Sequence, residues 1–256
     1  MNEYLGKTVL VTGATKGLGS IAAAAFAQRG ARICLVGRTE SRLSEVRASL
    51  PEPDRHIVFC GDLLEREVVE RLALLVQKQW RAPDIVLHCM GGGYGFREPL
   101  LTWDQFEKLY RVNFAAGAEL NRLLVPKMTE GRGGHIVHVG STASTEAIGS
   151  VGYNTVKAGL AAYVRSVGNA LARSNVIVTG ILPGAFYGPG NAWRRMEETK
   201  PEVAAKFAAE RLPRGRIAEG EEMLPLLFLL TGPGASMMAG TCVAIDAGES
   251  HAYAAR

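Results

Sequence analysis

Long apolar runs, clustered cysteines and blocks of like charge are all absent from this sequence of 256 residues. No stretch is apolar for long enough to cross a bilayer, and the opening residues lead into a strand without the charged-then-apolar pattern of a secretion signal. The formal net charge is +4 without a Lys/Arg run, which argues against a nucleic-acid-binding protein. The cysteines are widely scattered, which favours reduced thiols in a cytoplasmic protein. They are Cys34, Cys60, Cys89 and Cys242.

A metal site is not indicated either. His135 and His138 are close in sequence, but side chains three residues apart on a strand point to opposite faces of the sheet. We therefore expect no metal, and neither a membrane nor a nucleic acid as partner.

Glycine is abundant, with 30 residues, and it clusters at the predicted turns. Short apolar runs alternate with helical stretches, a pattern typical of a parallel, doubly wound sheet whose strands are buried on both faces. Strands are expected at Lys7–Thr12, Arg32–Val36, His56–Cys60, Asp84–His88, His135–Val139 and Val176–Ile181. Helices are expected at Gly17–Arg29, Glu40–Leu50, Glu65–Gln79, Thr102–Met128 with a break near Gly117, and around Tyr153. Residues 1–256 therefore read as a single α/β domain without a linker or repeat.

The first predicted strand runs directly into the sequence TGATKGLG, residues 12–19, and then into a helix. Glycine is needed where the backbone turns sharply, approaches a pyrophosphate and packs a helix against a strand, and the helix N-terminus then faces the phosphates. Gly13, Gly17 and Gly19 give a GxxxGxG spacing. A glycine-rich turn alone is often only a turn, so it indicates a cofactor site only in combination with other motifs of the chain.

A second group of residues is suited to acid–base chemistry. Tyr153 and Lys157 are four residues apart, so on a helix they share one face. An ammonium beside a phenol favours the phenolate, so we expect Lys157 to lower the pKa of Tyr153. Ser141 precedes a turn rich in small residues and could reach the same point. Such a set can polarise a carbonyl and give it a proton, but a hydride has to come from a cofactor.

In order and spacing, these motifs resemble the short-chain dehydrogenase/reductase family over nearly the whole chain. Further matches are Asp62, Asn113, Pro183-Gly184 and a last strand within GTCVAIDAG, residues 240–248. The resemblance implies a Rossmann-type fold of about seven strands, a nicotinamide cofactor and a catalytic set of Asn113, Ser141, Tyr153 and Lys157, with Asn113 supporting a proton-relay water. The implied cofactor contacts are Gly13, Thr15, Lys16, Gly17, Leu18, Gly19, Arg38, Asp62, Leu63, Met90, Gly91, Tyr153, Lys157, Pro183 and Gly184.

The chain departs from the family pattern at three places. His88-Cys89-Met90-Gly91 stands where the family usually has Asn-Asn-Ala-Gly, so Cys89 and Met90 could fill space near the adenosine ribose. The interval from Ser141 to Tyr153 is twelve residues, one shorter than expected, so Thr142 or Ser144 could take the serine role. No threonine follows Pro183-Gly184, where the run is Ala-Phe-Tyr-Gly.

Cofactor choice can be predicted from charge. Sheets that bind NAD usually place an acid at the end of the second strand to hold the ribose hydroxyls. Here that strand ends Val36-Gly37-Arg38, and a guanidinium can pair with a 2′-phosphate. Lys16 adds a second cation, so NADP(H) is expected over NAD(H), unless both are solvated surface charges.

Residues 185–216 are the least family-like stretch and are expected to form a substrate lid. Residues Asn191–Arg211 have helical composition and carry several cations. These cations are either a solvated face or a site for an anionic or polyhydroxylated substrate, such as an acyl-carrier thioester, a sugar acid or a sugar nucleotide. Apolar or stacking walls could come from Tyr94, Phe96, Phe186, Tyr187 and Trp193.

The expected activity is hydride transfer between NADP(H) and a small carbonyl or secondary alcohol substrate. One alternative is a non-catalytic cofactor-binding regulator or structural subunit, against which the complete catalytic set argues. A second, an epimerase or dehydratase on a nucleotide sugar, generally has a longer C-terminal domain than the 40 residues after Arg216. The resemblance also implies a homo-oligomer, a tetramer or dimer, in which the helices near Asn113 and after Tyr153 pair across a two-fold axis.

Overall fold

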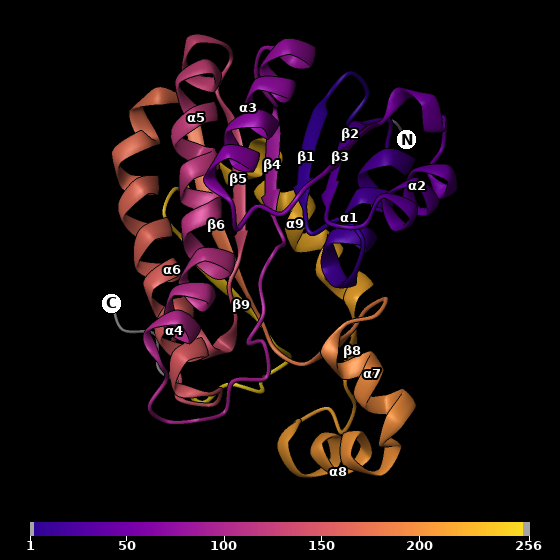
Figure 1. The fold of residues 1–256 in the computed structure, drawn as a ribbon, viewed down its shortest axis with the longest axis vertical. Helices are drawn as coiled ribbons and strands as arrows, with labels where there is room; N and C mark the ends of the chain where they lie inside the picture. Colours follow the sequence, from indigo (N-terminus) through magenta and orange to yellow (C-terminus); the bar gives the residue numbers. More distant parts are fainter. Residues whose placement is uncertain (1–2, 253–256) are drawn as a thin grey trace.

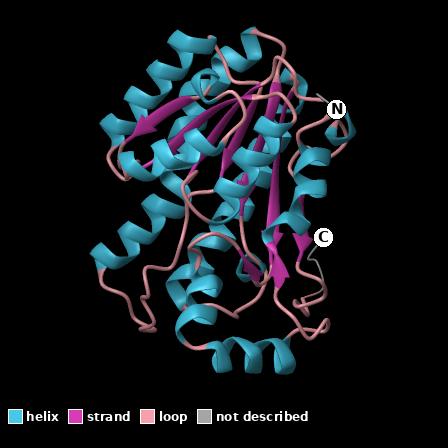
Figure 2. Cartoon of the chain, turned by 90° about the vertical axis from the view of Figure 1, so that its right-hand side faces the viewer, coloured by secondary structure: helices cyan, strands magenta, loops and turns pink. Residues whose placement is uncertain are grey.

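Seven parallel strands form the central sheet of the computed structural model, which describes residues 3–252 (Figures 1 and 2). Their order across the sheet is β3-β2-β1-β4-β5-β6-β9, so the chain reverses direction across the sheet between β1 and β4. The strands are β1 (Thr8–Thr12), β2 (Arg32–Gly37), β3 (Ile57–Cys60), β4 (Ile85–His88), β5 (Gly134–Val139), β6 (Val176–Pro183) and β9 (Cys242–Ile245). The predicted doubly wound α/β fold in one domain is confirmed, and the strands expected from apolar runs are present within two residues.

Helices cover both faces of this sheet. Apolar residues of α1 (Gly17–Gln28), α2 (Glu40–Ser49) and α9 (Leu224–Leu230) share one buried core with one face. Those of α3 (Arg66–Trp80), α5 (Ala116–Glu130) and α6 (Val151–Leu171) share a second core with the other face. Figure 1 shows these two layers on either side of the strands. Burial on both faces explains why the strands are continuous apolar runs rather than alternating ones.

The long helix expected from Thr102 to Met128 is interrupted, as predicted. It consists of α4 (Trp103–Tyr110), a π-helix (Arg111–Ala115) and α5, which ends at Glu130. Thr102 begins α4 with a capping box, in which its side chain accepts a hydrogen bond from Gln105 N. The interruption expected near Gly117 is this π-helix, which ends just before that residue, while Gly117 itself lies within α5 and packs against the rings of His88 and His138. The irregular turn contains Asn113, and π-turns of this kind often occur at functional sites.

Two short strands and two helices make up the predicted lid segment, residues 185–216, and the residues just after it. These are β7 (Phe186–Tyr187), β8 (Ala218–Glu219), α7 (Ala192–Thr199) and α8 (Pro201–Arg211). The helix expected across residues 191–211 is therefore two helices, because Pro201 starts a new one at a position where its missing N–H is not needed. A small core of its own, with Trp193 against Phe207 at 4.3 Å between ring centroids, holds the lid together below the main sheet (Figure 1).

No helix in the described range 3–252 combines the length and the apolar character that a membrane span requires.

One carboxylate ties the starts of the two central strands together. Asp84 accepts hydrogen bonds from the Thr8 backbone N–H and hydroxyl, both at 2.9 Å, and from Lys7 at 3.2 Å. The Asp84 N–H in turn donates to the Thr8 hydroxyl. Burial opposes the charge, but the bonds from Thr8 and Lys7 outweigh it and hold the pKa of Asp84 below its ordinary value. Asp84 thereby fixes β1 against β4, whose far ends carry the predicted site.

Asp84→Asn is expected to lower the free energy of unfolding at pH 7 by about 1–3 kcal/mol, because an amide cannot accept all of these bonds. A group whose pKa is lower in the folded state adds stability above its unfolded pKa, which is about 4, and loses it as the pH falls. Urea titrations should therefore show the difference between wild type and variant narrowing from pH 7 towards pH 3. A difference that is the same at both pH values would contradict this account.

Candidate active site

The predicted site residues gather at the carboxyl ends of β1, β4, β5 and β6. These four strands are neighbours in the sheet, and all point the same way. Crevices outside the carboxyl ends of parallel strands, where the strand order reverses, are the usual ligand sites of open α/β sheets. The glycine-rich turn follows β1, Gly91 follows β4, Ser141 follows β5, and Pro183-Gly184 ends β6.

The glycine-rich turn has the geometry that its sequence predicts. Gly13 and Gly17 have φ of +68° and +52°, a region that L side chains rarely adopt. A Cβ on Gly13 would lie 3.0 Å from Met90 N, so the loop after β4 packs directly on this turn. The helix α1 begins at Gly17, and its N-cap Lys16 makes no side-chain cap hydrogen bond. An N-terminus of this kind presents backbone N–H groups and the positive end of the helix dipole to a phosphate.

The loop after β4 is held by Asn113. Its Oδ1 accepts from Gly92 N at 3.0 Å, and its Nδ2 donates to the carbonyls of Gly92 and Leu109. A Cβ on Gly91 would lie 2.9 Å from Asn113 Oδ1 and 3.3 Å from Lys157 Nζ. The Asn113 side chain therefore clamps the loop against the π-helix. The glycine that this chain shares with the family pattern is required there by space.

The first two residues of that loop, Cys89 and Met90, serve packing. Met90 N donates to the Thr12 hydroxyl at 3.3 Å, and a Cβ on Gly19 would lie 3.2 Å from Cys89 Cβ. Burial raises the pKa of the Cys89 thiol to about 12, so it is neutral. Cys89 and Met90 thus fill the space between the loop and the glycine-rich turn.

Ser141, Tyr153 and Lys157 meet between the end of β5 and the start of α6. Lys157 is buried, and its Nζ donates to the Val139 carbonyl at 2.9 Å. The same ammonium lies 5.6 Å from the centroid of the Tyr153 ring. The Ser141 hydroxyl faces the Tyr153 phenol and accepts a hydrogen bond from Ala143 N at 3.1 Å. Of the three candidates for the serine role, Ser141 is the one that interacts with the phenol, despite the short interval.

The expected lowering of the Tyr153 pKa is wrong in this structure. Burial raises the pKa of the phenol, and the hydrogen bond with Ser141 offsets the rise only in part. Lys157 does not reverse the direction because its Nζ is directed at the Val139 carbonyl. Burial also lowers the pKa of Lys157 to about 8. Tyr153 is therefore a neutral phenol at pH 7, the form that can give up a proton.

Cations line the edge where an adenosine ribose would lie. Arg38 is largely exposed, and its Nη1 is 3.8 Å from Asp62 Oδ2. The pKa of Lys16 is lowered, first by desolvation and then by the guanidinium groups of Arg42, Arg195 and Arg38. Four cations thus share this edge, with Asp62 beside one of them. The donor set fits an anionic group, and together with the glycine-rich turn it fits a nicotinamide dinucleotide.

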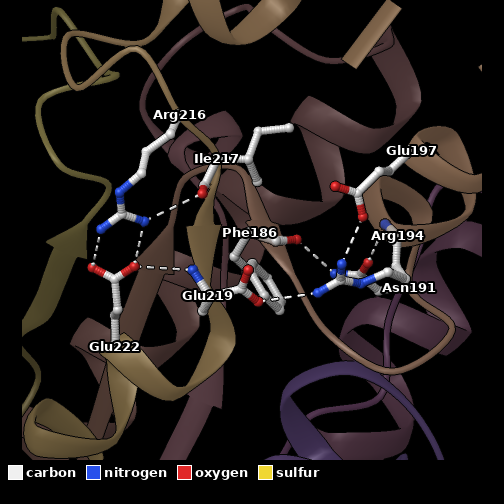
Figure 3. Close-up of polar contacts among 8 residues, drawn as sticks. All are labelled: Phe186, Asn191, Arg194, Glu197, Arg216, Ile217, Glu219 and Glu222. Atoms are coloured by element: carbon white, nitrogen blue, oxygen red, sulfur yellow. Dashed lines mark hydrogen bonds and ion pairs between the residues drawn. The ribbon is translucent and has the colours of Figure 1, made fainter. Parts of the chain in front are cut away.

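Three other arginines of residues 185–216 form ion pairs with glutamates, and Figure 3 shows those of Arg194 and Arg216. Arg194 pairs with Glu197 at 2.6 Å and with Glu219 at 3.0 Å. Arg214 and Arg216 both pair with Glu222 at 2.8 Å. These arginines organise the lid, so their number does not indicate an anionic substrate. The ring of Trp193 packs against Phe207, and the Arg194 guanidinium lies over the ring of Tyr187.

Two features of the site were not foreseen from the sequence. Glu249 is half-buried next to Gly184 and accepts a hydrogen bond from Ala185 N at 2.6 Å, and burial raises its pKa. His88 and His138 stack at 4.3 Å beside Asn113, and Asn121 bonds to both rings. They line a cavity of about 10 Å³, the size of one water, that reaches Asn113. Glu249 belongs to no motif, whereas the positions of His88 and His138 at the ends of neighbouring strands were a usable signal.

Comparisons with known proteins agree with this geometry. The sequence profile of the short chain dehydrogenase family matches residues 7–199. The 3-oxoacyl-[acyl-carrier-protein] reductase FabG of Thermotoga maritima is 25% identical over 245 residues, which cover 95% of this chain and 97% of that protein. Glucose 1-dehydrogenase of Gluconobacter oxydans is 26% identical over 253 residues, 96% of this chain and 93% of that protein.

Among solved structures, L-sorbose reductase from Gluconobacter frateurii, complexed with NADPH and L-sorbose, superposes with a TM-score of 0.89. The two chains are 26% identical, and the match covers 99% of this chain and 100% of the other. The family profile spans most of the chain, including the glycine-rich turn, Asn113, Ser141, Tyr153 and Lys157. The protein therefore belongs to the short chain dehydrogenase family.

Proposed function

We propose that this protein is an oxidoreductase that transfers a hydride between NADP(H) and the carbonyl or secondary alcohol group of a small molecule. This proposal rests on one observation. Ser141, Tyr153 and Lys157 lie together near the glycine-rich turn, at the carboxyl ends of the central strands. A non-catalytic regulator would have no use for a neutral, half-buried phenol against a serine hydroxyl and a buried ammonium. The competing class is therefore disfavoured.

Each residue has a distinct role in the proposed reaction. In the reducing direction the Tyr153 hydroxyl gives its proton to the carbonyl oxygen, while Ser141 donates a hydrogen bond to the same oxygen. The nicotinamide, when bound, supplies the hydride. Lys157 holds the ribose, and Asn113 keeps the loop at Gly91 and Gly92 in place and supports a proton-relay water. Thr15, Leu18, Leu63 and Pro183-Gly184 complete the proposed cofactor contacts.

We further propose a polyhydroxylated carbonyl compound or alcohol as the substrate. Arg194, Arg214 and Arg216 are paired with glutamates, so the charges of these three residues do not argue for an anionic substrate. L-sorbose reductase, whose structure is similar, was solved in complex with L-sorbose, a polyhydroxylated ketone, and this supports the proposed substrate class. A thioester of an acyl carrier remains the second candidate, supported by the likeness to 3-oxoacyl reductases. The four free cysteines fit the proposed cytoplasmic location.

Tyr153→Phe should remove most of kcat and leave cofactor binding nearly intact, because the variant keeps the ring but not the proton. General acid catalysis typically contributes about 10²–10⁴-fold. Steady-state rates and titration with NADPH measure the two effects. The control is Tyr110→Phe, which removes an exposed hydroxyl on α4. Retention of more than half of kcat by Tyr153→Phe would reject the assignment.

Ser141→Ala should lower kcat less than Tyr153→Phe but far more than Thr142→Ala or Ser144→Ala. The reverse order would assign the serine role to Thr142 or Ser144.

We expect this protein to bind NADP(H) about 10- to 100-fold more tightly than NAD(H). Charge-assisted pairing of the 2′-phosphate with Arg38 and Lys16 should contribute about 1.5–3 kcal/mol, which corresponds to that ratio. The preference should weaken with salt, because the cations are exposed. Replacing Gly37 with Asp and Arg38 with Ser should reverse it, since a carboxylate would meet the ribose hydroxyls. Calorimetric Kd values for both cofactors provide the measurement. Equal Kd values in the wild type, or an unchanged preference in the double variant, would contradict the assignment.

A homo-oligomer, a dimer or tetramer, is proposed through α4 and α6. Trp103, Phe106 and Tyr110 are exposed on α4, and Ala158 and Ala162 are exposed on α6. Apolar side chains of this size are commonly covered at subunit interfaces. Light scattering at micromolar concentration should give a multiple of 27.4 kDa. A monomeric mass would reject the interface, and Trp103→Glu should lower the mass of an oligomer that uses it.

A further inference from the structure

The lid lies directly on the glycine-rich turn. Gly17 N donates to the Pro189 carbonyl at 2.8 Å, and a Cβ on Gly188 would lie 3.0 Å from Gly17 Cα. A Cβ on Gly190 would lie 3.6 Å from the Lys16 side chain. The absence of a threonine at position 188, after Pro183-Gly184, therefore has a structural reason, because that position has no room for a side chain. The turn after β1 and the start of the lid pack as one unit.

This contact brings a lid cation to the cofactor edge. Arg195 is on the first turn of α7, exposed, and its Nη1 donates to the Gly190 carbonyl at 2.6 Å. Gly190 is the residue that faces Lys16. The Arg195 guanidinium is one of the neighbouring cations that help to lower the pKa of Lys16. In contrast to Arg194, its neighbour on α7, Arg195 forms no ion pair among residues 3–252.

The guanidinium groups near Lys16 lower the pKa of its ammonium, and an anion bound beside it would offset this repulsion. Lys16 comes from the glycine-rich turn, Arg38 and Arg42 from the end of β2 and the start of α2, and Arg195 from the lid. A phosphate has enough oxygens to accept from several of these donors at once. The arrangement therefore matches one compact dianion that joins the lid to the body of the domain.

We propose that Arg195 completes the site for the cofactor 2′-phosphate, so that NADP(H) fastens the substrate lid to the glycine-rich turn and NAD(H) does not. This rests on the proposed cofactor preference and extends it from affinity to the lid. Part of the discrimination between the cofactors then lies on the segment that also covers the substrate. With NAD(H) the lid keeps its contact between Gly17 and Pro189 but lacks the phosphate that neutralises Arg195.

The test uses the full-length protein and two readouts that do not depend on turnover. In calorimetry, Arg195→Ala should raise the Kd for NADP⁺ by about 5- to 10-fold and leave the Kd for NAD⁺ within about 2-fold, as expected for one exposed charge-assisted contact. Arg195→Lys keeps the positive charge, so it should raise the Kd for NADP⁺ by less than Arg195→Ala does. The matched control is Lys206→Ala, which removes an exposed lid cation on α8 that pairs with Glu210. It should change neither Kd.

Hydrogen–deuterium exchange at saturating cofactor reports on the lid itself. Peptides covering residues 185–199 of the wild type should exchange more slowly with NADP⁺ than with NAD⁺, and Arg195→Ala should abolish this difference. Equal loss of affinity for both cofactors, or equal exchange with both in the wild type, would overturn the proposal. If the wild type prefers NADP⁺ and Arg195→Ala has no effect, this inference alone fails. If the wild type binds both cofactors equally, the proposed cofactor preference fails with it.

Discussion

A buried ammonium is the constraint on which the site depends. Lys157 is 3% exposed, and a charge in that position is costly unless it is hydrogen-bonded. The Val139 carbonyl at the end of β5 supplies a bond, which fixes the first turns of α6 against the sheet. Asn113 Oδ1 and the Lys157 ammonium together leave no room for a side chain at Gly91, and Asn113 also accepts a hydrogen bond from the neighbouring Gly92 N. Tyr153, one turn before Lys157, is positioned by these contacts together.

The fold could be predicted because its signals are local and agree with one another. Strands buried on both faces are mostly apolar along their whole length, so their limits could be predicted from runs such as TVLVT in β1. In the glycine-rich turn, Gly13 and Gly17 have a left-handed backbone and the turn is closely packed. Few residue types other than glycine meet both requirements. The interruption of the long helix lies near Gly117, as expected, but that glycine is not its cause. Gly117 instead makes room for two histidine rings, and the π-helix around Asn113 has no composition signal.

The electrostatics of the site could not be predicted from spacing alone. A four-residue separation on a helix brings Lys157 near Tyr153, but the direction of the Tyr153 pKa depends on burial, which a sequence motif does not report. The lid cations form a similar case. Arg194 and Arg195 are adjacent in the sequence, yet one pairs with Glu197 and Glu219 while the other turns towards Lys16. Whether an arginine is available to a ligand thus depends on ion-pair partners that are distant in the sequence, such as Glu219, which is 25 residues from Arg194.

The most direct test of the central claim is whether this protein oxidises NADPH. Absorbance at the nicotinamide band would be followed with a panel of polyhydroxylated and simple ketones, aldehydes and a 3-oxoacyl thioester, each offered with NADPH and with NADH. The account predicts consumption of NADPH with at least one polyhydroxylated carbonyl compound, with one alcohol formed per NADPH lost, and slower consumption of NADH. Tight binding of NADPH with no consumption across the panel would contradict it and identify a cofactor-binding protein without turnover.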